Sequence, residues 1–260
     1  MGEIHARGLH FDVACASNFR DKAHRLAQRR MNKVEKSPTK VVFLFDVDNT
    51  LLDNDTVAAN LQRHLAIEIG AAGAQEYWQI FEQLRTELGY ADYLGALQRY
   101  RNKHPRAMHL LSVSDFLINY PFAERLFPDA IKVIQHVQQF GPAVILSDGD
   151  VVFQPLKISR SGLANAISGH VLIYVHKEQE LDEVERCYPA EHYVLVDDKL
   201  RILDAVKKFW ASRVTTVFVR QGHYATDSKM IAGYPPADIS IERIGDLLQY
   251  DLPELLGPNR

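Results

Sequence analysis

Short runs of consecutive apolar residues recur along the chain, each of the length expected for a β-strand. The clearest runs cover residues 41–45, 143–146, 171–175, 193–196 and 214–219, and a weaker run lies near Ile239–Ile241. Because these residues are apolar at consecutive rather than alternate positions, we expect both faces of the predicted sheet to be covered. Most of the runs end at polar residues, so polar chemistry is expected at the ends of strands.

Helix-like stretches separate several of these runs. Residues 130–140 precede the second run and residues 200–210 precede the fifth. Apolar strands that alternate with helices favour an α/β fold, in which helices cover a parallel sheet and sites form at the carboxyl ends of the strands. The predicted architecture is therefore a Rossmannoid parallel sheet.

The interval between the first two strands is too long for a simple crossover. Asp48 and Ser147 are 99 residues apart, whereas a βαβ crossover needs only about a dozen. Two series of apolar residues in this interval follow helical spacing: Val57, Leu61, Leu65 and Ile69, then Tyr77, Phe81, Leu84 and Leu88. We therefore expect an inserted all-helical cap over residues 54–127, and an α/β core formed by residues 41–53 and 128–260.

The first forty residues differ in composition from the rest of the chain. They contain nine Lys or Arg residues and four Asp or Glu residues, without a strong apolar period. We interpret residues 1–40 as a basic N-terminal tail, a solvated extension that is dispensable for turnover. A basic docking arm and a transit peptide are the alternatives.

Charge and composition argue against several classes of protein. The net charge of −3 is too close to neutral for strong nucleic-acid affinity across the whole molecule. No apolar run approaches the roughly 20 residues of a membrane span, and we find no secretory signal. The two cysteines, Cys15 and Cys187, lie far apart and build no disulfide framework. We expect a cytoplasmic protein with no nucleic-acid or membrane partner, and the oligomeric state stays open.

Carboxylates follow two of the predicted strands directly. Asp46 and Asp48 come after the first strand, and Asp197 and Asp198 come after the fourth. Two like charges about 5 Å apart repel by roughly 3 kcal/mol at an effective dielectric constant near 20, so such a cluster calls for a cation. Oxygen ligands without nearby Cys or His favour Mg²⁺ over zinc. The alternative, that these carboxylates cap the following helices, is more reasonable for one isolated Asp than for four.

These residues carry a resemblance to a known family. Residues 46–50, with the sequence DVDNT, resemble the DxDxT signature of the haloacid dehalogenase-like (HAD) phosphohydrolases. Ser147 resembles the second family motif, Lys177 the third, and residues 196–198 the acidic metal motif. The helical insertion between the first two motifs resembles the C1 cap of that superfamily.

The resemblance implies a role for each carboxylate. Asp46 is the expected nucleophile, which forms an aspartyl-phosphate, and Asp48 is the expected general acid and base. Asp46, Asp197 and the backbone carbonyl of Asp48 are expected to hold Mg²⁺, with Asp198 as a direct or indirect partner.

The remaining motif residues are expected to bind the phosphoryl group. Ser147 and the backbone amides of Asp148 and Gly149 would contact its oxygens, and Lys177 would neutralise charge on the nucleophile and the phosphoryl group. Lys157 is a rival to Lys177 for this role. We interpret it instead as a solvated lysine on a helix, and we prefer Lys177.

The predicted function is Mg²⁺-dependent hydrolysis of a small phosphorylated metabolite, since the helical insertion is placed to close over the strand ends. A receiver domain uses similar residues, but in another order along the chain. Dehalogenases and phosphonatases of the superfamily lack the second Asp of the signature, which Asp48 supplies here. A phosphomutase or phosphotransferase stays open as an alternative, and so does a catalytically silent adaptor.

Overall fold

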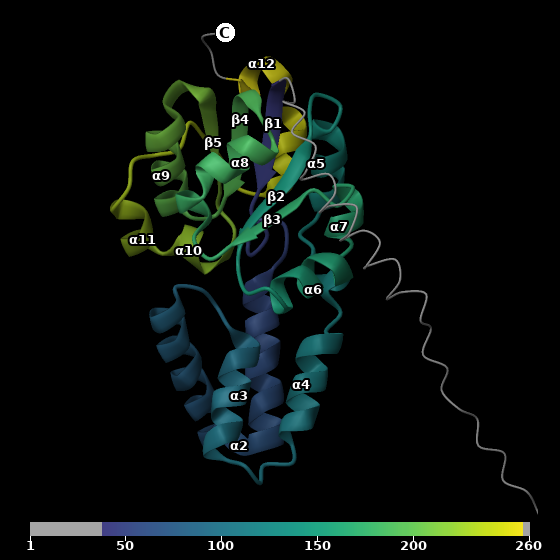
Figure 1. Cartoon of the computed structure of the whole chain (residues 1–260), viewed down its shortest axis with the longest axis vertical. Helices are drawn as coiled ribbons and strands as arrows, with labels where there is room; N and C mark the ends of the chain where they lie inside the picture. Colours follow the sequence, from purple (N-terminus) through teal and green to yellow (C-terminus); the bar gives the residue numbers. More distant parts are fainter. Residues whose placement is uncertain (1–37, 257–260) are drawn as a thin grey trace, which may run out of the picture. The chain divides into compact units, whose positions relative to one another are not determined.

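The structure, a computed structural model, describes residues 38–256 (Figure 1). The interpretation of the N-terminal tail therefore falls almost wholly outside the described residues. Within them, the first strand begins at Thr39, two residues before the apolar run that predicts it. No helix in this part of the chain combines the length and the hydropathy required to cross a membrane.

Six parallel strands form one sheet in the described part of the chain, in the order β3-β2-β1-β4-β5-β6. They are β1 (Thr39–Phe45), β2 (Ala143–Asp148), β3 (Val171–Tyr174), β4 (Ala190–Asp197), β5 (Val214–Val219) and β6 (Ile239–Ile241). β1 lies between β2 and β4, with Phe45 opposite Ile145 on one side and Val196 on the other. The carboxyl ends of β1, β2 and β4 therefore meet at one edge of the sheet.

Helices cover both faces of the sheet, as the continuous apolar runs predict. Successive side chains of a strand point to opposite faces, so Phe43 and Phe45 pack in one apolar cluster while Val42 and Leu44 pack in the other. The first cluster includes residues of α5 (Ala130–Val137), α6 (Phe153–Arg160) and α7 (Leu163–Ala166), and the second includes residues of α8 (Leu181–Cys187) and α9 (Leu200–Trp210). In Figure 1, α9 lies to the left of the strands and α5 and α7 lie to the right.

Shorter helices complete the α/β core. They are α10 (Gly222–Thr226), α11 (Ser228–Ala232), α12 (Leu252–Leu255) and the 3₁₀ turns η2 (Lys177–Gln179), η3 (Ala211–Arg213) and η4 (Ile244–Gln249), whereas the 3₁₀ turn η1 (Phe122–Arg125) lies at the end of the insertion between β1 and β2. The turn η2 matters most for function, because it begins at Lys177 and places this residue directly beyond β3.

The insertion between β1 and β2 is helical, as the sequence predicts. It contains α2 (Asn54–Leu88), α3 (Tyr93–Lys103) and α4 (Leu110–Asn119), seen in the lower half of Figure 1. Asp53 caps α2 by accepting a hydrogen bond from the Thr56 amide at 2.9 Å. Helical φ/ψ angles are interrupted at Gly70, which lies between the two predicted series of apolar residues.

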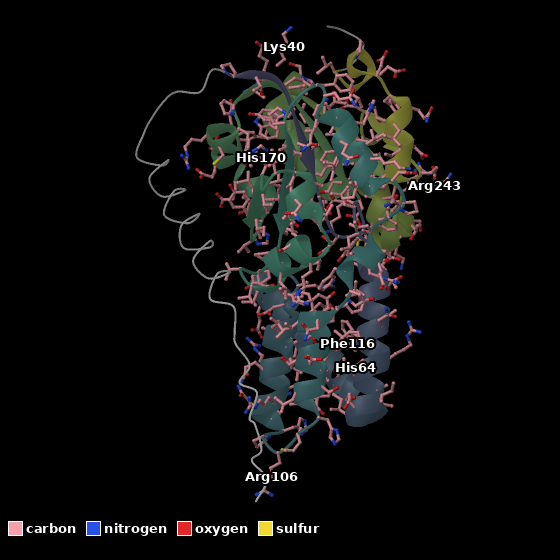
Figure 2. All side chains as sticks on the ribbon, turned by 90° about the vertical axis from the view of Figure 1, so that its right-hand side faces the viewer. Lys40, His64, Arg106, Phe116, His170 and Arg243 are labelled. Atoms are coloured by element: carbon pink, nitrogen blue, oxygen red, sulfur yellow. The ribbon has the colours of Figure 1, made fainter. Side chains whose placement is uncertain are left out.

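Side chains of α2 pack against α3 and α4 in the interior of the insertion. Tyr77 is fully buried and its hydroxyl donates to the Tyr93 carbonyl at 2.9 Å. Figure 2 shows His64 of α2 beside Phe116 of α4, where the two rings stack with centroids 4.5 Å apart. Apolar and aromatic contacts of this kind give the insertion its own packed interior.

The two segments that join the insertion to the sheet pair with each other. Leu52 and Leu126 form an antiparallel bridge. The Asp53 amide donates to the Arg125 carbonyl at 2.8 Å, and the Phe127 amide donates to the Leu51 carbonyl at 3.0 Å. The chain therefore leaves the sheet and returns to it through two adjacent, hydrogen-bonded linkers.

Candidate active site

Three carboxylates from neighbouring strands meet at the carboxyl edge of the sheet. Asp46 follows β1, and its amide donates to the Val196 carbonyl of β4 at 3.0 Å. Asp197 ends β4 and Asp198 follows it. One carboxylate oxygen from each of the three Asp residues lies within 4.8 Å of the other two. The parallel register therefore brings together three of the four carboxylates that the sequence placed at two strand ends, and the Asp48 side chain lies outside this cluster.

Lys177 lies against this cluster and is fully buried. Its ammonium lies 2.5 Å from Asp46 Oδ1 and 2.6 Å from Asp197 Oδ2, and it also donates to the Leu146 carbonyl at 3.3 Å. Burial acts to raise the pKa of Asp46, but Lys177 and Lys199 more than offset it and hold that pKa below its usual value. The lysines thus favour the ionised form of Asp46, which is the form that the predicted role as a nucleophile requires.

The cluster carries more negative charge than the protein itself neutralises. Asp46 Oδ2 and both carboxylate oxygens of Asp198 are buried without a hydrogen-bond partner. Burial, the largest influence, raises the pKa of Asp197 to about 6 and that of Asp198 well above its usual value, despite the nearby lysines. Unsatisfied carboxylate oxygens in this arrangement are the donor set of a hard divalent cation, so the residues fit Mg²⁺.

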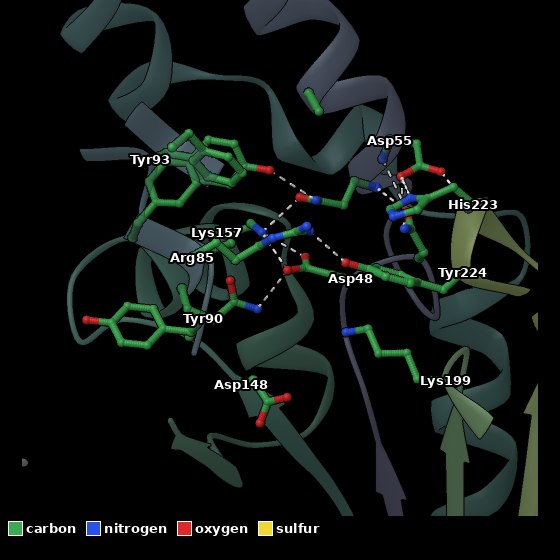
Figure 3. Close-up of a pocket in the computed structure, with 18 of the residues that line it drawn as sticks. Asp48, Asp55, Arg85, Tyr90, Tyr93, Asp148, Lys157, Lys199, His223 and Tyr224 are labelled. Atoms are coloured by element: carbon green, nitrogen blue, oxygen red, sulfur yellow. Dashed lines mark hydrogen bonds and ion pairs between the residues drawn. The ribbon is translucent and has the colours of Figure 1, made fainter. Parts of the chain in front are cut away.

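Asp48 has a different environment from Asp46. Its side chain is 26% exposed and faces a cavity, whereas that of Asp46 is 3% exposed. Lys157 of α6 donates to both carboxylate oxygens of Asp48, at 2.7 and 2.9 Å (Figure 3). The interpretation of Lys157 as a solvated lysine is therefore wrong. Its side chain is only 1% exposed, because α6 packs with this face toward the end of β1.

The segment after β2 supplies Ser147 and its neighbours. Ser147 is buried, and its hydroxyl accepts a hydrogen bond from the Gln154 amide at 2.9 Å. The Asp148 carboxylate accepts from the Lys177 amide at 2.8 Å and so ties η2 to the end of β2. The Gly149 amide donates to the Tyr174 carbonyl at 3.0 Å. This differs from the expectation for Gly149, because its amide hydrogen is engaged by β3 instead of being free for a phosphoryl oxygen.

A cavity of about 550 Å³ lies above these residues. Its lining includes Asp48 and Lys199 from the core and Arg85 and Tyr93 from the insertion (Figure 3). Arg85 of α2 donates to the hydroxyl of Tyr224 in α10 at 3.1 Å, so the helical insertion touches the core across the cavity. The Lys199 ammonium lies 5.0 Å from the centre of the Tyr224 ring, a cation–π distance.

A second contact joins the first turn of α2 to the core. The Asp55 carboxylate accepts from the His223 amide at 2.8 Å and lies 2.6 Å from His223 Nδ1. It also accepts from the Asn49 side-chain amide at 3.0 Å. Asn49 belongs to the DVDNT segment (residues 46–50), so these bonds connect the loop after β1, the start of the insertion and α10.

The predicted site did not include several residues that the structure brings to it. They are Gln154, Lys157, Lys199 and His223. Gln154 and Lys157 are three residues apart on α6 and therefore share one helix face. A glutamine and a lysine at this spacing, soon after a strand that ends in the second motif, were the signal that could have pointed to them.

The fold and the site together define a hydrolase-type α/β protein with a helical cap and a carboxylate cluster. The family model for haloacid dehalogenase-like hydrolases matches residues 41–209. A solved structure of a protein from Burkholderia xenovorans LB400, assigned as a haloacid dehalogenase-like hydrolase, is 63% identical to this chain and has a TM-score of 0.79. The match covers 82% of this chain and 100% of that one. The chain therefore belongs to the haloacid dehalogenase-like hydrolases, which confirms the predicted family and fold class.

More distant solved structures share this fold. An L-2-haloacid dehalogenase from Xanthobacter autotrophicus, solved with chloropropionic acid covalently bound, is 19% identical over 81% of this chain and 97% of its own, with a TM-score of 0.53. A HAD-type hydrolase from Bacillus subtilis bound to magnesium is 17% identical over 82% of this chain and 98% of its own, with a TM-score of 0.52. No protein with a curated function matches the sequence significantly.

Proposed function

We propose that the protein is a Mg²⁺-dependent phosphomonoester hydrolase that works through an aspartyl-phosphate. The observation that carries this proposal is the pairing of two carboxylates in different environments. Asp46 is buried, ionised and held against Lys177, while Asp48 faces the cavity two residues further along the chain. A nucleophile beside an acid and base serves both halves of a covalent phosphoryl transfer.

The chain's own residues account for both steps. An Asp46 oxygen attacks phosphorus as the ester P–O bond breaks, and Asp48 gives its proton to the leaving oxygen. The Asp48 carboxylate then takes a proton from water, which attacks the aspartyl-phosphate and releases inorganic phosphate and free Asp46. We expect the Ser147 hydroxyl and the Lys177 ammonium, which lies 2.5 Å from Asp46 Oδ1, to bind the phosphoryl oxygens of the substrate. Mg²⁺ would be held by Asp46, Asp197 and the Asp48 carbonyl, with Asp198 close by, and supplies positive charge against the transferring phosphoryl group.

Two observations favour phosphate esters over haloacids as substrates, although haloacid dehalogenases share the fold. A halide leaves as an anion and takes no proton, whereas an alkoxide leaving group takes a proton that Asp48, which faces the cavity, could supply. The buried oxygens of Asp46 and Asp198 that lack a partner favour a bound cation, which would stabilise the negative charge of a transferring phosphoryl group.

The cavity supports a small phosphorylated metabolite as the substrate. Its volume of about 550 Å³ is that of a pocket for a small molecule, and side chains of the insertion such as Arg85 and Tyr93 close it on one side. A phosphoprotein or a nucleic acid would have to displace the insertion. Closure over a small ester would exclude water and strengthen the electrostatic attraction to the phosphoryl group.

The test measures phosphate release from phosphorylated metabolites and phosphopeptides, and halide release from 2-haloacids. Each substrate is tested with Mg²⁺ and with a chelator. We expect release from small phosphate esters, loss of activity in the chelator and recovery with Mg²⁺ but not with Ca²⁺, whose looser coordination suits in-line transfer poorly. Halide release without phosphate release would overturn the proposal. Full activity in the chelator would contradict the assignment of a catalytic Mg²⁺. A preference for phosphopeptides would contradict the proposal that the substrate is a small metabolite.

A further inference from the structure

We propose that Lys157 is a positioning residue that fixes the Asp48 carboxylate in the orientation needed for proton transfer. The inference rests on the proposed phosphatase function and adds to it a residue outside the four family motifs. It starts from a buried lysine that neither the nucleophile nor the cation cluster uses.

Each of the three ammonium hydrogens of Lys157 has a hydrogen-bond acceptor. An ammonium has three hydrogens to donate. Lys157 donates to Asp48 Oδ1 at 2.7 Å, to Asp48 Oδ2 at 2.9 Å and to Asn54 Oδ1 at 3.0 Å. Because both carboxylate oxygens are bound to one atom, the carboxylate of Asp48 is restrained from turning about its Cβ–Cγ bond. Its exposed part is left facing the cavity, where the leaving oxygen of a substrate would lie.

A second residue on the same face of α6 extends this arrangement. The side-chain amide of Gln154 donates to the Ser147 hydroxyl at 2.9 Å and lies 3.5 Å from Asp48 Oδ2. Both Gln154 and Lys157 are almost fully buried. One face of α6 therefore contacts both Asp48, the expected acid and base, and Ser147, which is expected to bind the phosphoryl group. These contacts fix the positions of Asp48 and Ser147 relative to each other.

Lys157 also links Asp48 to the helical insertion. Asn54, its third partner, is the first residue of α2, and the Asn54 side-chain amide donates to the Tyr93 hydroxyl at 3.3 Å (Figure 3). Tyr93 begins α3 and lines the cavity. A buried lysine that only stabilised the core would not need to bind both Asp48, the expected acid and base, and Asn54, at the start of the helical insertion.

The consequence is a specific pattern of kinetic defects. A misplaced acid slows the release of a leaving group that needs a proton, whereas 4-nitrophenolate leaves without one. We expect Lys157→Met to lower turnover of an alkyl phosphate by about 100-fold, the scale of a lost general acid or base. With 4-nitrophenyl phosphate, we expect a rapid burst of one 4-nitrophenol per enzyme followed by a slow steady state, because the hydrolysis of the aspartyl-phosphate still needs Asp48 as a base.

Two further variants separate positioning from folding. Arg160→Met removes a positive charge from an exposed position one turn further along α6, and it should leave the turnover of both substrates unchanged. Lys157→Cys, treated with 2-bromoethylamine, restores an ammonium at nearly the length of lysine and should recover most of the turnover. The wild type treated in the same way controls for modification of the native cysteines, and circular dichroism confirms that each variant is folded.

The outcomes distinguish the two proposals. If the wild type releases no phosphate from any ester, the proposed function fails. If the wild type is active but Lys157→Met slows both substrates equally, with a reduced burst and no stalled aspartyl-phosphate, Lys157 has only a structural role. Unchanged activity of Lys157→Met, or absence of rescue in a folded Lys157→Cys enzyme that accepts the aminoethyl group, also overturns the inference.

Discussion

At the scale of single residues, the site depends on a contrast between two carboxylates of one short segment. Asp46 is buried and held ionised by Lys177, and Asp48 lies at the edge of the cavity with Lys157. The strand geometry creates this contrast, because Asp46 follows β1 directly while Asp48 lies in the loop beyond it. Lys177 pairs with Asp46 and Asp197, whereas Lys157 pairs with Asp48, so the two carboxylates of this segment have different cationic partners.

We expect Asp46→Asn and Asp48→Asn to fail in different ways. An amide is a poor nucleophile, so Asp46→Asn should show no turnover with any phosphate ester. Asp48→Asn keeps the nucleophile and should lose about 10²–10⁴-fold in turnover. With 4-nitrophenyl phosphate it should accumulate a phosphorylated enzyme, which mass spectrometry of the intact protein would detect.

The two variants also serve as controls for each other. Asp46→Asn should never gain the mass of a phosphate, because the attacked position is missing. Sustained multiple turnover by Asp46→Asn would exclude a covalent intermediate on this residue and leave direct attack by water as the mechanism.

The sequence predicts the residues at strand ends better than those on helices. Asp46, Ser147 and Asp197 could be placed together because parallel strands end at the same edge of a sheet. Lys157 is harder to place, since its spacing from Gln154 shows that the two share one face of α6 but not that this face packs against Asp48. The burial of Lys157 is a property of the tertiary fold, and so is the hydrogen bond that engages Gly149 with β3.

At the scale of elements, the start of α10 packs against Asn49 in the loop that follows β1. Gly222 has a φ of 72°, and a Cβ atom at this position would lie 2.4 Å from Asn49 Cβ. Asn49 Oδ1 accepts hydrogen bonds from the amides of Asn54 and Asp55, at 3.0 and 3.1 Å. The close approach of α10 therefore supports Asn49, which binds the first two amides of α2 beside the N-cap residue Asp53.

We expect Gly222→Ala to lower both stability and activity, whereas Gly169→Ala should lower stability alone. Gly169 has a φ of 78° but open space around it, so alanine there meets only the backbone strain, about 1 kcal/mol in the free energy of unfolding. Gly222→Ala adds a collision with Asn49 and should cost about 2 kcal/mol or more. Urea unfolding and kcat/KM for a phosphate ester would measure the two effects, and equal values for both variants would contradict this explanation.

Element types are predicted well in this chain, and element pairings less so. The predicted helix over residues 200–210 matches α9, and the fifth apolar run matches β5, because each carries a period or composition that is visible locally. The pairing of Leu52 with Leu126 joins positions on opposite sides of the insertion. No local pattern encodes such a contact, so only the folded chain reveals it.

At the scale of the whole molecule, we expect the carboxylate cluster to make stability depend on pH and on a bound cation. The pKa of Asp197 is raised to about 6, and those of Asp148 and Asp198 are also raised, chiefly by burial. Without a metal, these three groups bind more protons in the folded state than in the unfolded chain between about pH 4 and pH 6. Their contribution to the free energy of unfolding therefore falls as the pH rises through this window, opposite in sign to that of Asp46, whose pKa is lowered.

We expect the thermal midpoint in a chelator to be lower at about pH 7.5 than at about pH 5, and Mg²⁺ to reverse this order. The cation replaces the protons that the carboxylates lose, so its stabilising effect should grow with pH. In the double variant Asp197→Asn, Asp198→Asn, the pH dependence in the chelator should be weaker. A midpoint in the chelator that rises from pH 5 to pH 7.5 would show that other groups control the stability.

The paired linkers at Leu52 and Leu126 have a consequence for how such a protein can change. The two ends of the insertion are hydrogen-bonded neighbours, so the residues between them form one loop that is closed at its base. The entropic cost of closing such a loop grows only slowly with its length, so insertions of different length can be joined at these positions. A cap from another member of the family, joined at these two positions, should leave the sheet and its carboxylates undisturbed. We expect such an exchange to change the preferred substrate without changing the reaction that we propose for the residues of the sheet.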